Sequence, residues 1–131
     1  MDNVSQIDQI SGCVNSWESR GLYRRFFGDV DGDQIIKSNF ELHAHVRFKE
    51  IEYIINDFSQ ITGLLVDKAD TKAFAVSDEI ISKTKGRLKI AIVVLLEPYR
   101  TLAETYCQHM NGSHFECAVF PSREDAQAWA V

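Results

Sequence analysis

The chain has 131 residues, of which 45% are hydrophobic and 25% charged, a composition typical of one globular domain with a real core. Its net charge of −5 argues against a general nucleic-acid-binding protein, which presents a clustered basic face. The first ten residues lack the basic and apolar segments of a signal peptide, and no apolar run reaches the roughly 18 residues that span a bilayer. We therefore expect a single soluble, cytoplasmic domain over residues 1–131.

An antiparallel pair of strands is predicted at the N-terminal end. Apolar residues alternate with polar ones over residues 4–10, which indicates an edge strand. The aromatic run LYRRFFGDV, from residue 22, predicts a second strand that ends at Gly28. The turn between them is expected within residues 15–21, and the exposed edge favours cover by a second copy in a homodimer.

A capped helix is predicted next. Asp31 and Gln34 have the spacing of a capping box, and an apolar stripe of helical period continues to about His45. A calcium loop is rejected because Gln34 and Phe40 occupy the places where that pattern needs glycine and an acid. His43 and His45 are two apart and do not share a helix face, so we expect no metal site there.

The run IEYIINDF, residues 51–58, predicts a third strand that ends at Asp57. A polar, glycine-containing exit then follows to Gly63. Ligands often bind at such exits in open α/β sheets, so Asp57, Ser59, Thr62 and Gly63 are candidate partner-binding residues. A plain strand-to-helix loop capped by its polar side chains explains the same pattern.

The longest apolar run, RLKIAIVVLL at residues 87–96, predicts the central strand of an α/β layer, covered on both faces. A helix over residues 67–85, ended by Gly86, is predicted before it. Pro98 closes the run and begins a helix that continues to Met110.

The C-terminal segment predicts a last strand over residues 115–120 and a short final helix. Ser122 and Asp125 have capping-box spacing at the start of this helix, and Trp129 is expected to fasten it to the core. Strands and helices thus alternate through most of the chain, which predicts a mixed sheet whose later strands are parallel and joined by right-handed crossovers.

The three cysteines are too few, and odd in number, for a disulfide framework, so reduced thiols are expected. Cys107 and Cys117 could bind zinc with His109 and His114, but structural zinc sites usually pair their ligands in Cys-x-x-Cys knuckles. Neither cysteine has an evident electropositive setting that would make it a nucleophile. We expect no metal and no cofactor.

The chain contains four characteristic segments in this order: FFGDVDGDQI, NDFSQITG, LKIAIVVL and AVFPSREDAQAWA. With them the chain resembles the SpoIIAA-like proteins of the STAS superfamily, over roughly Leu22 to Val131. The resemblance implies an α/β fold with a mixed sheet of four to five strands and about four helices packed mainly on one face.

The resemblance also bears on function. Anti-sigma-factor antagonists of this superfamily carry a phosphorylatable serine in a segment like Asp-Ser-Ser-Gly, where this chain has GLLVDK from Gly63 to Lys68. The serine is missing, so a phosphorylation switch at that place is not expected. A STAS-type protein-interaction domain without the usual serine is one functional expectation.

The other expectation comes from CRAL-TRIO proteins of related architecture, which hold apolar ligands between a helix and the sheet. By this likeness the chain is a non-catalytic module for a small apolar or lipid-like ligand, with peripheral membrane association through the Leu64–Val66 run beside Lys68. Ordinary core packing explains the same side chains. The candidate ligand-binding residues are Leu64, Leu65, Phe74, Ile80, Ile81, Tyr99, Leu102 and Tyr106.

An enzyme is the least favoured class. Asp57, Ser59 and either His43 or His45 could be assembled into a nucleophile and a base. However, the sequence has no G-x-S-x-G elbow, glycine-rich phosphate loop or H-E-x-x-H motif. We therefore assign no catalytic residue.

Overall fold

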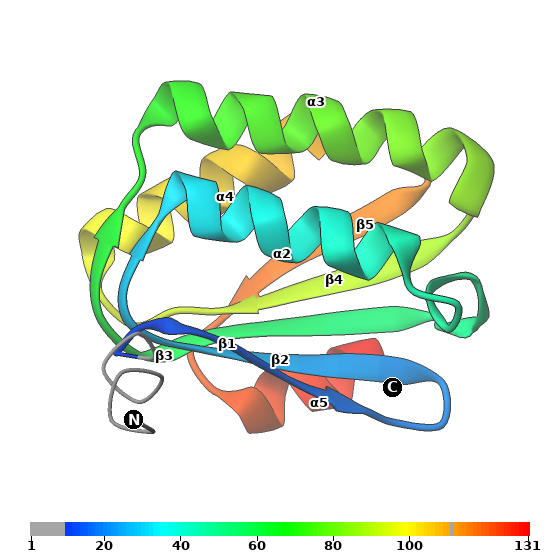
Figure 1. Ribbon diagram of the computed structural model, residues 1–131, viewed down its shortest axis with the longest axis horizontal. Helices are drawn as coiled ribbons and strands as arrows, with labels where there is room; N and C mark the ends of the chain where they lie inside the picture. Colours follow the sequence, from blue (N-terminus) through cyan, green and yellow to red (C-terminus); the bar gives the residue numbers. More distant parts are fainter. Residues whose placement is uncertain (1–9, 111) are drawn as a thin grey trace, which may run out of the picture.

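The computed structural model, which describes residues 10–110 and 112–131, has one five-stranded sheet between helical layers (Figure 1). Strand β1 is antiparallel to β2, and the other neighbouring strands are parallel. The mixed α/β sheet predicted from the sequence is confirmed. The strands, in sheet order, are β1 (Gly12–Trp17), β2 (Gly21–Asp31), β3 (Tyr53–Leu65), β4 (Leu88–Val93) and β5 (Phe115–Phe120). The helices are α2 (Gly32–Ala44), the short 3₁₀ helix η1 (Phe48–Glu50), α3 (Lys68–Lys85), α4 (Glu97–Met110) and α5 (Arg123–Ala130).

The two faces of the sheet build two separate cores. Leu22 and Phe26 of β2 belong to a large core together with buried side chains of α2, α3 and α4. Tyr23, between them in sequence, belongs to a smaller core that α5 closes with Ala126. This division follows from the two-residue period of a strand. Figure 1 shows the three long helices on one side and α5 on the other, so the prediction of helices mainly on one face is confirmed.

The starts of α2, α3 and α5 have side-chain caps, but the predicted capping box of α5 is only half present: Ser122 Oγ accepts the Asp125 N–H at 3.1 Å without the reciprocal bond. Asp31 and Gln34 form the expected capping box at the start of α2. Asp67 forms a second capping box with Asp70 at the start of α3. Gly86 ends α3 with φ of 87°, a left-handed conformation that glycine adopts without steric cost.

The predicted loop over residues 57–63 is wrong, because β3 continues through it to Leu65. β3 pairs with β4 only as far as the Asp57–Val93 register, whereas its pairing with β2 extends to Leu65. The second half of β3 therefore forms a two-stranded ribbon with β2. The other edge of this half of β3 extends past the end of β4. Polar residues are tolerated on such a ribbon, and this is why the segment resembles a loop in sequence.

The predicted central strand is also shorter than expected. β4 covers Leu88–Val93, and its residues are buried except Lys89, which is half-buried. Leu95 and Leu96 lie beyond the strand with exposed fractions of 58% and 62%. β4 has a neighbour on each side, but β3 occupies the middle of the sheet.

The strand predicted over residues 4–10 lies almost entirely outside the described residues. The first strand that the structure describes is β1, which pairs with β2 through the registers from Gly12–Phe27 to Trp17–Leu22. The chain turns between β1 and β2 at residues 18–20, within the predicted turn.

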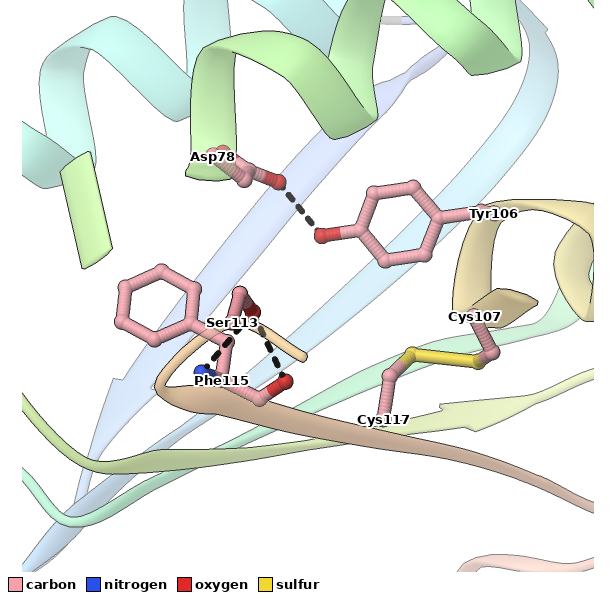
Figure 2. Close-up of a disulfide and its surroundings, with 6 residues drawn as sticks. All are labelled: Asp78, Tyr106, Cys107, Ser113, Phe115 and Cys117. Atoms are coloured by element: carbon pink, nitrogen blue, oxygen red, sulfur yellow. Dashed lines mark hydrogen bonds between the residues drawn. A yellow bond between two sulfur atoms is a disulfide. The ribbon is translucent and has the colours of Figure 1, made fainter. Parts of the chain in front are cut away.

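A disulfide between Cys107 and Cys117 joins the last turn of α4 to β5, contrary to the expectation of reduced thiols (Figure 2). The crossover from α4 to β5 brings the two Cα atoms to 5.1 Å, within the range that a disulfide spans. By the chain-entropy model, closing a loop of this length stabilises the fold by about 2–3 kcal/mol. The thiols are therefore not free to bind zinc.

Within residues 10–110 and 112–131, no helix has both the length and the apolar character required to cross a membrane.

Candidate functional site

A cavity of about 100 Å³ lies between the sheet and the layer formed by α2, α3 and α4. Its wall is mainly apolar and takes side chains from four strands and all three helices. The apolar wall includes Phe26, Ile54, Ile90, Ile92, Phe74 and Ala103. The cavity is thus bounded by the same alternating strand positions that build the larger core.

Five of the eight predicted ligand-binding residues line this cavity: Leu64, Phe74, Tyr99, Leu102 and Tyr106. The other three do not. Leu65 and Ile80 have exposed fractions of 69% and 60%, while Ile81 packs against the core without reaching the cavity wall. On α3 the buried positions begin at Thr71 and Phe74 and repeat at helical spacing, so Ile80 lies on the solvent side.

A buried cation lies in the wall. Arg24 of β2 is only 4% exposed and shares its sheet face with Leu22 and Phe26. Its Nε donates to Asn56 Oδ1 at 2.8 Å, and its Nη2 donates to Asn39 Oδ1 at 2.9 Å. The side chain therefore connects β2, β3 and α2 through hydrogen bonds at one point of the cavity.

A second polar group faces the cavity from the helices. Tyr106 of α4 donates a hydrogen bond to the carboxylate of Asp78 on α3 (Figure 2). Burial raises the pKa of Asp78, although the Tyr106 hydrogen bond and Arg24 oppose this shift. Burial, followed by the nearby Asp78 charge, raises the pKa of Tyr106 well above 10. The Tyr106 hydroxyl therefore stays protonated at neutral pH and donates a hydrogen bond.

His43 of α2 lies beside this pair, with Nε2 3.6 Å from Asp78 Oδ1. Burial, and secondly the cation of Arg24, lower the pKa of His43 to about 4. The contact is therefore not an ion pair at neutral pH, in spite of its geometry. The imidazole is neutral, and Asp78 has no cationic partner in direct contact among the described residues.

Four polar residues of the wall were not predicted from the sequence: Arg24, Asn39, Asn56 and Asp78. For Arg24 a signal was available, because strand alternation places it on the same face as Leu22 and Phe26. For Asp78 the signal was its helical spacing from Phe74 on the buried stripe of α3. No comparable pattern distinguished Asn39 and Asn56 from ordinary polar residues.

Asp57 and the two histidines that were considered for an enzyme site are not brought together. The Asp57 carboxylate accepts a hydrogen bond from Tyr23 at 2.5 Å on the α5 side of the sheet. His43 lies on the opposite side, in the cavity wall. His45 stacks on Trp17, with 4.4 Å between the ring centroids. Asp57 and the histidines therefore cannot act on one substrate.

The predicted partner-binding residues separate as well. Asp57 is 4% exposed and accepts the backbone N–H of Ser59. Thr62 and Gly63 lie on the β2–β3 ribbon, where the Thr62 hydroxyl donates to Asp29 Oδ1 at 2.6 Å. The surface-accessible part of the predicted set is therefore a strand rather than a loop.

The described part of the chain contains no group of three histidine, cysteine, aspartate or glutamate residues arranged to hold a metal ion.

The solved structures that resemble the chain over most of its length include the following two. An uncharacterized protein of the DUF3478 family with a SpoIIAA-like fold, from Shewanella loihica PV-4, gives a TM-score of 0.60 at 15% sequence identity, and the match covers 92% of this chain and 95% of that one. The anti-sigma factor antagonist SpoIIAA in its unphosphorylated form gives a TM-score of 0.59 at 10% identity, covering 89% and 94%. No family model and no curated protein sequence matches the chain.

The shifted pKa of His43 predicts a pH-dependent stability. The unfolded histidine, with its ordinary pKa of 6.5, takes up a proton before the folded one, whose pKa is about 4, so the folded state loses stability as pH falls through this window. Asp78 has the opposite effect on stability. Its pKa is raised in the folded state, so its contribution to the free energy of unfolding is present at low pH and is lost as pH rises. The variant His43→Gln keeps Asp78, and it should lose less stability than the wild type between pH 6.5 and 4.5. Urea unfolding measures the difference, and equal losses in the two proteins would contradict the prediction.

Proposed function

The chain has a SpoIIAA-like fold, and on this fold we propose that it is a non-catalytic module that binds a small apolar ligand between the sheet and helices α2, α3 and α4. The observation that supports this proposal is the cavity, with its largely apolar wall and its smaller number of polar groups. Ligand sites in proteins are usually concave, largely apolar and supplied with a small number of oriented polar groups.

The cavity volume bounds the ligand. An apolar cavity of roughly 150 Å³ accepts a molecule of the size of benzene. The space of about 100 Å³ is smaller than that cavity, so one aromatic ring or a short branched chain is the largest ligand we expect, and its entry requires small shifts of the wall side chains. A long acyl chain needs the helices to move apart, so we restrict the proposal to small molecules.

The composition of the wall supports binding rather than catalysis. The Asp78 carboxylate accepts the Tyr106 hydrogen bond and lies against His43, and the described wall contains no serine, cysteine or lysine. Thr71 is its only aliphatic hydroxyl, and that group donates to the backbone oxygen of Asp67 at 3.0 Å.

Filling the cavity tests this function. Ala103 of α4 lines the cavity, and Ala130 of α5 packs against the smaller core on the other face, so Ala103→Leu and Ala130→Leu add the same groups in the two places. Toluene serves as the probe, followed by NMR titration. We expect the wild type and Ala130→Leu to bind toluene, and Ala103→Leu to bind it at least about 10-fold more weakly, because the added side chain occupies the space.

Two results would count against the proposal: toluene binding that is the same in all three proteins, or no binding by any of them together with a purified wild type that releases no small molecule on extraction.

Contact with another macromolecule is a second candidate function, favoured by the β2–β3 ribbon. Beyond Asp57 one edge of β3 has no strand partner in the described part of the chain, and such an edge can accept a strand from a partner protein. Leu65, at the end of the ribbon, is a large exposed apolar side chain beside Lys68. It could equally insert into a membrane surface.

The variant Leu65→Glu tests this surface, with Ile80→Glu as a control because Ile80 is comparably exposed on α3. We expect Leu65→Glu alone to lose a protein captured from the lysate of the source organism, or to lose co-sedimentation with anionic liposomes, by about 10-fold or more. Loss of lysate capture would identify a protein partner, and loss of liposome co-sedimentation would identify a membrane surface. Equal behaviour of both variants and the wild type in both arms would remove the ribbon from consideration.

A further inference from the structure

The guanidinium of Arg24 is incompletely used by the protein. Two of its nitrogens, Nε and Nη2, donate to Asn56 and Asn39. The third, Nη1, is buried and has no hydrogen-bond partner among residues 10–110 and 112–131. An arginine remains protonated in proteins, and Nη1 carries two N–H donors, so donors of a buried cation are left unmet inside the larger core.

The positive charge is also without a direct counter-charge. No described carboxylate oxygen lies within 4.0 Å of the Arg24 nitrogens. Asp78 faces the same cavity, but its oxygens contact Tyr106 and His43. Burying a charge is costly unless the charge is paired. A buried N–H donor that makes no hydrogen bond adds a further desolvation penalty. The two amide hydrogen bonds and the Phe26 ring, whose centroid lies 5.3 Å from Arg24 Cζ, offset this cost only in part.

An anionic group on the ligand would satisfy both deficits. Arg24 lines the cavity, and guanidinium groups bind carboxylates with short, charge-assisted hydrogen bonds. Most of the wall is apolar, with Ile92 and Phe74 among its members, and it therefore favours an organic acid over a fully hydrated inorganic anion.

We propose that the cavity binds a small carboxylic acid, such as an aromatic or short branched-chain acid, whose carboxylate accepts hydrogen bonds from Nη1 of Arg24 while its apolar body lies against the strand and helix side chains. This inference rests on the proposed function and adds the chemical class of the ligand. Asn39 and Asn56 then act as positioning residues that hold the guanidinium in place.

Benzoate, benzamide and toluene test this proposal, because they share a ring and differ in charge. Their affinities are measured by NMR titration at pH 7 for the wild type, Arg24→Met and the control Arg25→Met. Arg25 lies next to Arg24 on β2 and is half-buried on the other face. We expect the wild type and Arg25→Met to bind benzoate about 10- to 100-fold more tightly than benzamide, the effect of one strong charge-assisted hydrogen bond. Arg24→Met should lose this preference and still bind toluene.

The outcomes separate the two proposals. If toluene binds but benzoate is not preferred over benzamide by the wild type, the role of Arg24 is overturned and the apolar binding function stands. If none of the three probes binds the folded wild type and the purified protein releases no small molecule on extraction, the carboxylate site and the apolar function both fail. Should Arg24→Met not fold, the comparison of benzoate with benzamide on the wild type decides alone.

Discussion

The burial of the Arg24 guanidinium is the constraint on which the larger core, between the sheet and helices α2, α3 and α4, depends. Its hydrogen bonds to Asn56 and Asn39 fix α2 over the junction of β2 and β3, and they place the polar end of the cavity. Removing a charge from water costs several kcal/mol, and two neutral amides compensate for it only in part. A side chain of such cost in a core of leucine, isoleucine and phenylalanine is explained better by recognition than by stability.

The fold could be predicted from the sequence because its signals are local. The capping box of Asp31 and the glycine after Lys85 define helix ends within one turn of the chain, and the structure has them where expected. The length of β3 could not be predicted, because polar residues after Asp57 are equally compatible with a loop and with a ribbon paired to β2 alone. The Cys107–Cys117 disulfide depends on how α4 passes over β5, which no local pattern determines.

The candidate site was predicted only in part, for a related reason. Helical spacing identifies apolar side chains such as Tyr99, Leu102 and Tyr106, and these do line the cavity. The spacing does not show that space is left between them and the sheet, since complete packing produces the same pattern. The polar wall requires contacts between segments distant in sequence, as between Arg24 and Asn56 or between Asp78 and Tyr106. Such contacts follow from the register of the sheet and the placement of helices over it.

A crystal structure of the wild-type protein grown with benzoate tests the role of Arg24 directly. We predict benzoate in the cavity, with a carboxylate oxygen about 2.7–2.9 Å from Nη1 of Arg24, the distance of a charge-assisted hydrogen bond. An empty cavity, with Nη1 of Arg24 bonded to the carboxylate of Asp78, would show that the protein pairs this cation by itself, and it would contradict a ligand-binding role for Arg24.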